Sequence, residues 1–280
     1  MTDKTHITNL LEAQWQAISQ LCADLAEWDA PTQCPGWSVK DNVSHIIGTE
    51  RMLLGDSLPE IDIDTESEKY AHVKNDIAKA NEKWMEERRG WSGPEVLAEF
   101  NEVTARRIKV LREMSQEDFD APSWTPAGQD TYGRFMQIRL YDSWTHEQDI
   151  RQAIGQTGHL SGAVVDAALL EVCKAMGFVV GKLGGAPPDS RVEIRLTGQT
   201  PATIRVERIG DGTRSSVVDE FSEGEATVTI TLDFELFMRL TAGRVDNAEA
   251  VTSAVAAGNA SIEGDVEAGE RIAHHLAYLF

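Results

Sequence analysis

The 280-residue sequence lacks any run of about 18 consecutive apolar residues, the length that a membrane-spanning helix requires. Its first residues, MTDKTHITNLLEAQW, also lack the basic segment and apolar core of a secretory leader. We therefore expect a cytoplasmic protein with no membrane partner. With 41% apolar and 26% charged residues, the composition is that of an ordinary globular protein.

Cysteine is scarce. Cys22, Cys34 and Cys173 are an odd number of residues without CxxC spacing, so the sequence predicts neither a disulfide framework nor a thiolate zinc site. Cys34 has no histidine near it in sequence and precedes a Pro-Gly pair. We interpret it as a small buried turn residue rather than a nucleophile.

Positive charge is also scarce, because 26 Lys and Arg residues face 46 Asp and Glu residues, a formal net charge of −20. Such a protein repels nucleic acids and anionic membranes, and we expect neither as a partner. A small anionic substrate would need a local cation to bind it.

Several catalytic motifs are missing. The segment HEQDI begins like the HExxH of zinc proteases, but its fifth residue is Ile150, so the second imidazole is absent. The glycine-rich segments contain no phosphate-binding loop, and there is no GxSxG. These absences exclude a zincin protease and give no support to a serine hydrolase.

Apolar spacing in the first half predicts a helical bundle. Four principal helices are expected, with connections too long for a simple up-and-down arrangement, at about residues 7–25, 38–54, 94–114 and 132–154. A polar helix at about 68–89 is expected to be peripheral. The segments 55–67 and 115–131 are interpreted as loops.

After Gly158 the pattern changes to one helix followed by short alternating strands and further helices. The strands are expected at 191–198, 202–210, 226–233 and 259–265, and the helices at 161–185, at about 234–241 and from 266 onward. The sequence therefore predicts two domains. Residues 1–158 form a helical bundle, and residues 159–280 form an α+β domain with a mostly antiparallel sheet.

The segment RLYDSWTHEQDIR places Asp142 and His146 four residues apart, on the face of the helix that packs into the bundle. A buried carboxylate needs a partner. A divalent metal held by Asp142 and His146 is one solution. An ion pair of Asp142 with Arg139, with His146 hydrogen-bonded in the core, is the other. On this helix alone the ion pair is the preferred interpretation.

His45 is the candidate for a third ligand, because it lies in the helix that follows the Cys-Pro-Gly-Trp turn. The helical wheel places it away from the apolar face, so pattern alone favours a solvated side chain. The remaining histidines have no ligand spacing: His6, His72, His159, His274 and His275.

Two segments carry a resemblance to a known family. PTQCPGWSVKDNVSHIIGTE resembles a T-x-C-P-G-W-(S/T)-V-x-D-x-x-x-H signature, and RLYDSWTHEQDIRQAIG resembles an acidic residue four before a histidine, followed by x-x-D-(L/I)-R. Both are similar to the mycothiol-dependent maleylpyruvate isomerase family, within the wider DinB-like group of metal-binding four-helix bundles. The resemblance covers about residues 5–155.

The resemblance implies that His45, Asp142 and His146 bind a divalent metal, with zinc as the first choice. The characterised isomerase type has glutamate where this sequence has Asp142, so we expect the geometry or affinity of the site to differ. Asp149 could orient His146 from behind. A partner of Asp149 unrelated to the metal, such as a backbone N–H or Arg151, is the slightly preferred interpretation.

The second half resembles the family's C-terminal domain, which is similar in fold to sterol carrier protein 2. The match rests on VTITLDFELFMRLTAGRVDNAEA and GNASIEGDVEAGERIAHHL. The family has a functional arginine in this domain, and Arg244 is the best match to it. An equal alternative is that Arg244 only caps the preceding helix.

The activity implied by the resemblance is addition of a thiolate to an activated cis double bond, rotation, and elimination to the trans product. We expect mycothiol or a similar thiol as cofactor, a small anionic substrate, and cis–trans isomerase or S-transferase activity; a homodimer is left open. Two alternatives remain: a metal-dependent hydrolase that uses bound water, and a carrier of apolar ligands through the C-terminal domain.

Overall fold

The structure, a computed structural model, describes residues 2–210 and 215–279. The chain divides into two compact units, Met1–Gly158 and His159–Phe280. Within the described residues, no helix combines the length and the apolar character needed to cross a membrane.

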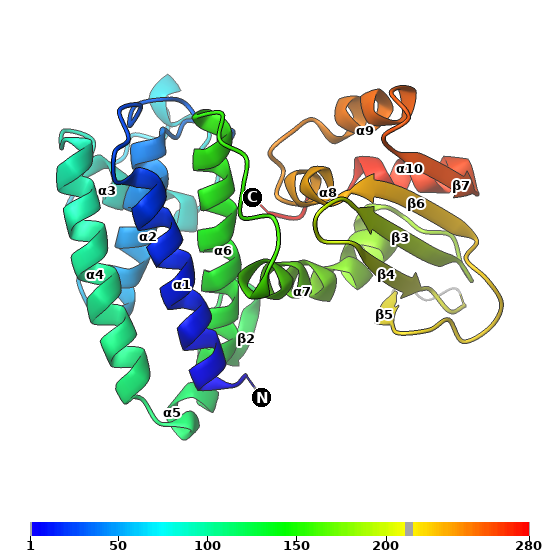
Figure 1. Cartoon of the computed structure of the whole chain (residues 1–280), viewed down its shortest axis with the longest axis horizontal. Coiled ribbons are helices and arrows are strands. Elements are labelled where there is room, and N and C mark those ends of the chain that lie inside the picture. The colour runs from blue at the N-terminus through cyan, green and yellow to red at the C-terminus, as the bar shows by residue number, and fades with distance from the viewer. Residues whose placement is uncertain (1, 211–214, 280) are drawn as a thin grey trace. The chain divides into compact units, whose positions relative to one another are not determined.

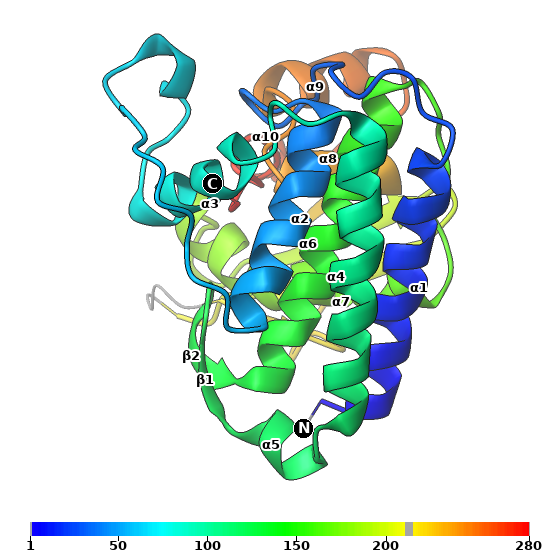
Figure 2. The ribbon, with the colours of Figure 1, turned by 90° about the vertical axis from the view of Figure 1, so that its left-hand side faces the viewer.

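Four long helices build the first unit (Figures 1 and 2): α1 Lys4–Cys22, α2 Val39–Leu53, α4 Gly93–Glu113 and α6 Tyr132–Ala153. Helices α1 and α2 each pack against both α4 and α6. This closed arrangement confirms the expected four-helix bundle. The interior is filled by apolar side chains at helical spacing, among them Leu11, Ile18, Val43, Phe100 and Ile150.

The start of α2 is fixed by local chemistry that the sequence reveals. The Ser38 hydroxyl accepts from the Asp41 backbone N–H at 3.2 Å, and the Asp41 carboxylate accepts from the Ser38 N–H at 2.9 Å. Before it, Gly36 adopts φ of 79°, a conformation that favours glycine. The turn and cap together set where the His45 helix begins.

Two segments of the first unit differ from the sequence prediction. The polar helix is shorter: a 3₁₀ turn, Glu68–Tyr70, is followed by α3, Asp76–Glu86, which begins where the Asn75 side chain accepts from the Ala78 N–H. The segment interpreted as a loop contains α5, Gln116–Asp120, and a hairpin of β1, Pro122–Thr125, and β2, Gly128–Thr131. These elements are too short and polar to produce an apolar period.

The second unit is α+β, as expected. Its helix α7, Ala163–Phe178, continues into a π-helical turn, Val179–Leu183, and the described strands form a five-stranded sheet in the order β5-β4-β3-β6-β7. Their bounds are β3 Arg191–Thr197, β4 Ala202–Glu207, β5 Ser216–Val218, β6 Val228–Asp233 and β7 Ser261–Gly264. Only the β3–β6 pair is parallel within this described sheet.

Alternation of side chains gives the sheet one apolar face. In β6 the apolar Val228, Ile230 and Leu232 are buried, and the threonines between them are partly exposed. Helices α7, α8 (Phe234–Thr241) and α10 (Val266–His274) pack against the strands. Strand β5 and helix α9, Asn247–Ala256, were not predicted from the sequence, since neither is flanked by clear turn and period signals.

Candidate metal centre

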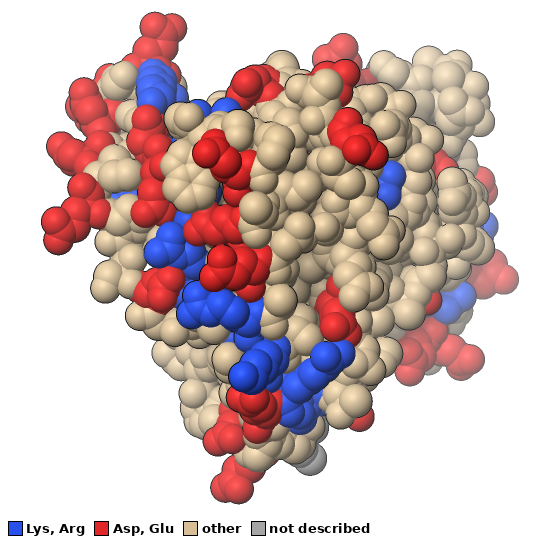
Figure 3. Space-filling view, turned by 60° about the vertical axis from the view of Figure 1, so that its left-hand side comes forward, with Lys and Arg blue, Asp and Glu red and all other residues tan. Residues whose placement is uncertain are grey.

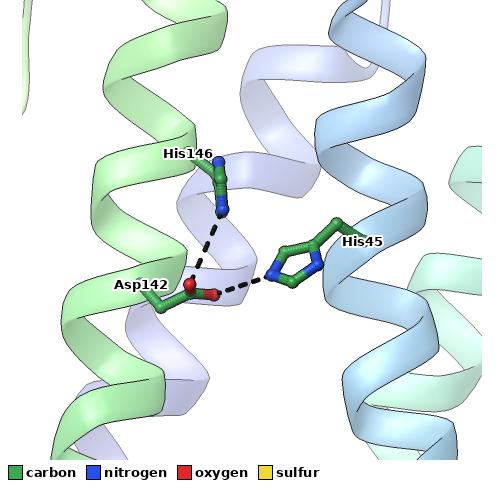
Figure 4. Close-up of side chains that lie close together, drawn as sticks. All are labelled: His45, Asp142 and His146. Atoms are coloured by element: carbon green, nitrogen blue, oxygen red, sulfur yellow. Dashed lines mark hydrogen bonds and ion pairs between the residues drawn. The ribbon is translucent and has the colours of Figure 1, made fainter. Parts of the chain in front are cut away.

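Three side chains from two helices of the bundle converge in its interior (Figure 4). His45 comes from α2, and Asp142 and His146 come from α6. The His45 Nε2 lies 3.3 Å from Asp142 Oδ2, and the His146 Nε2 lies 3.6 Å from Asp142 Oδ1. One ligand atom from each residue lies within 4.8 Å of the other two. The three residues predicted as ligands are therefore brought together.

The prediction from the helical wheel that His45 is solvated is wrong. Pattern alone favours a solvated histidine, whereas His45 is only 7% exposed. The reason is that α2 packs against α3, α4 and α6, so it is covered on nearly every side. A helix enclosed in this way buries polar flanks as well as its apolar stripe, and an amphipathic pattern cannot reveal that.

Two hydrogen-bond acceptors hold the His146 ring at Nδ1, the nitrogen that does not face Asp142. Its Nδ1 lies 2.7 Å from Asn42 Oδ1 on α2 and 3.1 Å from Asp149 Oδ2 on α6. Because both partners are acceptors, Nδ1 carries hydrogen, and in the neutral ring Nε2 presents its lone pair toward Asp142. Asp149 therefore contacts the imidazole. This arrangement is typical of a histidine prepared to bind a metal.

Asp142 also forms the ion pair with Arg139 that the pattern of this helix alone favours. The guanidinium of Arg139 donates through Nη1 to Asp142 Oδ2 and through Nε to Glu50 Oε1, the second bond at 2.8 Å. The pair and the cluster of ligand atoms are present together. The two interpretations of this helix do not exclude each other.

Burial and neighbouring charges set the protonation of the cluster. Burial lowers the pKa of His45, which favours its neutral, ligating form. Burial raises the pKa of Asp142, but Arg139 and the two imidazoles outweigh it and hold that pKa well below its usual range. For His146 burial opposes a charge, yet Asp142 and Asp149 raise its pKa. Asp142 is therefore ionised at neutral pH.

The cluster is exposed to solvent at Asp142, whereas its two imidazoles are covered by Trp37. The Asp142 side chain is 29% exposed, against 8% and 6% for His45 and His146, so approach is from the Asp142 side. The indole of Trp37 lies with its centroid 5.1 Å from the His45 ring and 5.5 Å from the His146 ring. Its Nε1 donates to Glu82 Oε1 at 3.0 Å, which anchors the indole.

The donor set fits a divalent cation. One carboxylate and two imidazoles are ligands that zinc accepts, and three protein ligands leave a position open, as in catalytic zinc sites. The buried His45 Nδ1 has no hydrogen-bond partner among the described residues, in contrast to His146 Nδ1. The two imidazoles are thus unequally supported.

Two further residues were singled out in the sequence, Arg244 and Cys34. Arg244 belongs to the second unit, where it follows α8 and its Nη1 donates to the Ala242 carbonyl at 3.0 Å. That bond is the helix-capping contact of the alternative interpretation, and a role toward substrate stays a prediction. Cys34 is partly buried in the turn before Trp37.

The chain was compared with known families. The family described as "Mycothiol maleylpyruvate isomerase N-terminal domain" matches residues 11–151, half of the chain. The chain belongs to this family. The matched range contains all three candidate ligands, His45, Asp142 and His146.

Two solved structures of an isomerase show the same fold. The mycothiol-dependent maleylpyruvate isomerase matches with a TM-score of 0.57 and 13% identity, over 87% of this chain and 90% of that chain. A histidine-to-alanine mutant of that isomerase matches over the same shares with a TM-score of 0.55 and 14% identity. Sterol carrier protein 2 from Yarrowia lipolytica, with a TM-score of 0.29 and 14% identity, covers 39% of this chain and 88% of that chain. The isomerase comparison supports the two-domain fold. No curated protein matches the sequence.

Three residues of the site were missed by sequence reasoning: Asn42, Glu50 and Trp37. Asn42 and Glu50 are fully buried on α2, and only knowledge that α2 is central would have drawn attention to them. Trp37 lies within the quoted signature, directly after the glycine turn. Its position next to a His-containing helix was the available signal.

Proposed function

We propose that this protein is a metal-dependent enzyme that uses a small thiol as nucleophile, in a cis–trans isomerisation like that named in its structural relative, the mycothiol-dependent maleylpyruvate isomerase. The observation that carries the proposal is the convergence of His45, Asp142 and His146 in a chain of this family. A divalent cation held there would lower the pKa of a bound thiol and supply thiolate at neutral pH.

The charge of the cluster supports an anionic additional ligand. A divalent ion held by one ionised carboxylate and two neutral imidazoles leaves one positive charge. The nearby Arg139 is paired with Glu50 as well as Asp142, so its positive charge is already offset by carboxylates. A thiolate would neutralise the remaining charge, and so would a hydroxide formed from metal-bound water. The preference for a thiol over water therefore rests on the family to which the chain belongs.

Two of the protein's three thiols do not fit the role of nucleophile. Cys22 is buried, and burial, assisted by Glu147, raises the pKa of its thiol to about 12. Cys173 belongs to the second unit, and burial raises the pKa of its thiol to about 11. Both are protonated at neutral pH. A thiol from outside the chain therefore suits the proposed chemistry better.

Arg244 is proposed to bind a substrate carboxylate. Its guanidinium can pair with a carboxylate through two parallel hydrogen bonds, which would offset the repulsion of an anion by a chain of charge −20. An Arg244→Lys variant keeps the charge but loses the paired geometry. We expect it to raise KM more than it lowers kcat, and equal kinetics would remove Arg244 from the site.

The test is isomerisation of maleylpyruvate, followed with and without mycothiol and after metal removal. We expect activity only when both thiol and metal are present. His146→Ala should lower kcat/KM by at least about 100-fold. His6→Ala is the matched control, because His6 is exposed on α1 of the same unit and should leave the rate unchanged.

Other outcomes identify other reactions. Accumulation of a stable thiol adduct, with no trans product, would assign an S-transferase. Turnover of esters that needs metal but no thiol would assign a hydrolase and contradict the proposed nucleophile. Full activity in metal-free protein would contradict the metal role.

A further inference from the structure

Two arginines share one fully buried carboxylate inside the bundle. Glu50 of α2 is 0% exposed and accepts from Arg139 Nε at 2.8 Å through Oε1 and from Arg107 Nε at 2.9 Å through Oε2. The two arginines are themselves 3% and 0% exposed. Fully buried ion pairs seldom stabilise a protein more than apolar residues of similar volume. This group therefore calls for a role beyond stability.

The two arginines differ in what else they contact. Arg139 donates through Nη1 to Asp142 Oδ2, so its planar guanidinium links Glu50 to the carboxylate of the candidate metal centre. Arg107 instead donates to the Tyr132 hydroxyl at 2.7 Å and lies 3.5 Å from the Met136 sulfur. Only Arg139 reaches a candidate ligand.

The contact fixes the rotation of the Asp142 carboxylate. Arg139 donates to Oδ2, which also lies 3.3 Å from His45 Nε2, while Oδ1 lies 3.6 Å from His146 Nε2. The Asp142 side chain is 29% exposed and has a short stem, so without Arg139 it could turn toward water. Arg139 cannot move with it, because its Nε is bound to the buried Glu50.

We propose that Arg139, anchored by Glu50, is a positioning residue that holds Asp142 in the orientation that binds the metal. This inference rests on the metal site of the proposed function. Loss of the orientation should weaken binding, as is usual when residues behind metal ligands are removed. The charge of Arg139 acts in the opposite direction, because it repels a cation.

Two double variants separate orientation from charge. Glu50→Gln with Arg139→Met removes the residue that holds Asp142. Glu50→Gln with Arg107→Met removes the other arginine and keeps the contact of Arg139 with Asp142. Each variant loses one negative and one positive charge, so both keep the net charge of the wild-type cluster. Both also lose one buried arginine of the same kind, which makes their stabilities comparable.

The measurement is the dissociation constant for Zn²⁺ in the full-length protein, by competition with a chromophoric chelator. We expect the Arg139 double variant to bind about 10- to 100-fold more weakly than wild type. The Arg107 double variant should stay within about threefold. Equal affinities in the two variants, or tighter binding without Arg139, would overturn the proposal.

Substitution with Co²⁺ gives a second measurement that a purely structural role would not change. The visible absorption of bound Co²⁺ reports ligand geometry, so it should change in the Arg139 double variant and remain as wild type in the Arg107 variant. Arg139→Lys keeps the charge in a protein better able to fold, but an ammonium lacks the planar fork that links two carboxylates. It should weaken Zn²⁺ binding about tenfold, and wild-type affinity with an unchanged spectrum would contradict the proposal.

The wild type distinguishes the two failures. Wild-type protein that binds neither Zn²⁺ nor Co²⁺ would contradict the proposed function itself. Wild-type binding together with equal binding by the two double variants would contradict only the role of Arg139.

Discussion

The interiors of the two units are built differently. In the first unit, charged side chains are wholly enclosed, with Glu50, Arg107 and Glu147 each 0% exposed. In the described part of the second unit, the most buried charged side chains are Glu193 and Glu207, each 7% exposed, and they lie on strands with polar neighbours. The second unit shows that this chain can build a core without enclosed charges. Among the enclosed charges of the bundle, Glu50 is linked through Arg139 to the candidate metal centre.

The largest expected effect comes from deleting the shared carboxylate. Glu50→Ala leaves Arg107 and Arg139 buried without their counter-ion and should destabilise the bundle by about 3–5 kcal/mol. Urea unfolding followed by tryptophan fluorescence measures this unit alone, because all seven tryptophans precede residue 145.

Glu193→Ala is the matched change in the second unit. Its partners Arg195 and Arg205 have side chains 52% and 35% exposed, so we expect a cost of no more than about 1 kcal/mol. Hydrogen exchange of the β3 and β4 amides measures it. If Glu50→Ala lowered the free energy of unfolding no more than Glu193→Ala, the enclosed carboxylate of the first unit would contribute no more to stability than that of Glu193, whose arginine partners are partly exposed.

A smaller effect is expected at Asn42. Asn42→Ala removes the acceptor of the shorter bond to His146 Nδ1, leaving only Asp149 to orient the ring. Zinc affinity should fall about tenfold. Thr104→Val is the control, because Thr104 is buried on α4 and bonds only within its own helix. Equal affinity of both variants would mean that Asn42 does not support the site.

The sequence predicted the bundle and the three candidate ligands, but for different reasons. The apolar spacing of a helix and its cap, such as the Ser38–Asp41 capping box of α2, depend only on residues close together in the sequence, so both can be predicted from it. The grouping of His45 with Asp142 was suggested by resemblance, because contacts across helices depend on which helix is central. Glu50 and Asn42 were missed for the same reason. Short polar elements such as the β1–β2 hairpin contain too few apolar residues to show the periodicity from which a strand is predicted.

A change of pH is expected to affect Cys22 of the first unit and Cys173 of the second unit in the same way, and only weakly. Cys22 and Cys173 have pKa values raised from 9.0 to about 12 and about 11, so stability from the buried neutral thiols is complete below pH 9 and is lost only as the pH rises toward those values. Between pH 6 and 8 we expect neither alkylation of these two thiols in the native protein nor a pH-dependent contribution from them to unfolding.

Mass spectrometry after alkylation, with urea-unfolded protein as the positive control, measures this. Rapid modification of native Cys22 accompanied by loss of activity would indicate that a protein thiol is the nucleophile.

The smallest effect is expected at the surface. On the face drawn in Figure 3, a band of basic side chains is bordered by acidic ones, so exposed charges are close to opposite charges. Elsewhere on the first unit, Lys109 and Glu113 of α4 form an exposed pair of opposite charges at 3.9 Å, with side chains 77% and 67% exposed. Lys109→Ala should change stability by less than about 0.5 kcal/mol. A cost comparable to that of Glu50→Ala would contradict the distinction between enclosed and exposed charges.

The metal content of the full-length protein tests the proposed site at His45, Asp142 and His146. Elemental analysis should find one divalent ion in each wild-type chain, about none in His146→Ala, and the wild-type amount in His6→Ala. Equal metal content in wild type and His146→Ala would contradict the account, since His45, Asp142 and His146 would then not form the site.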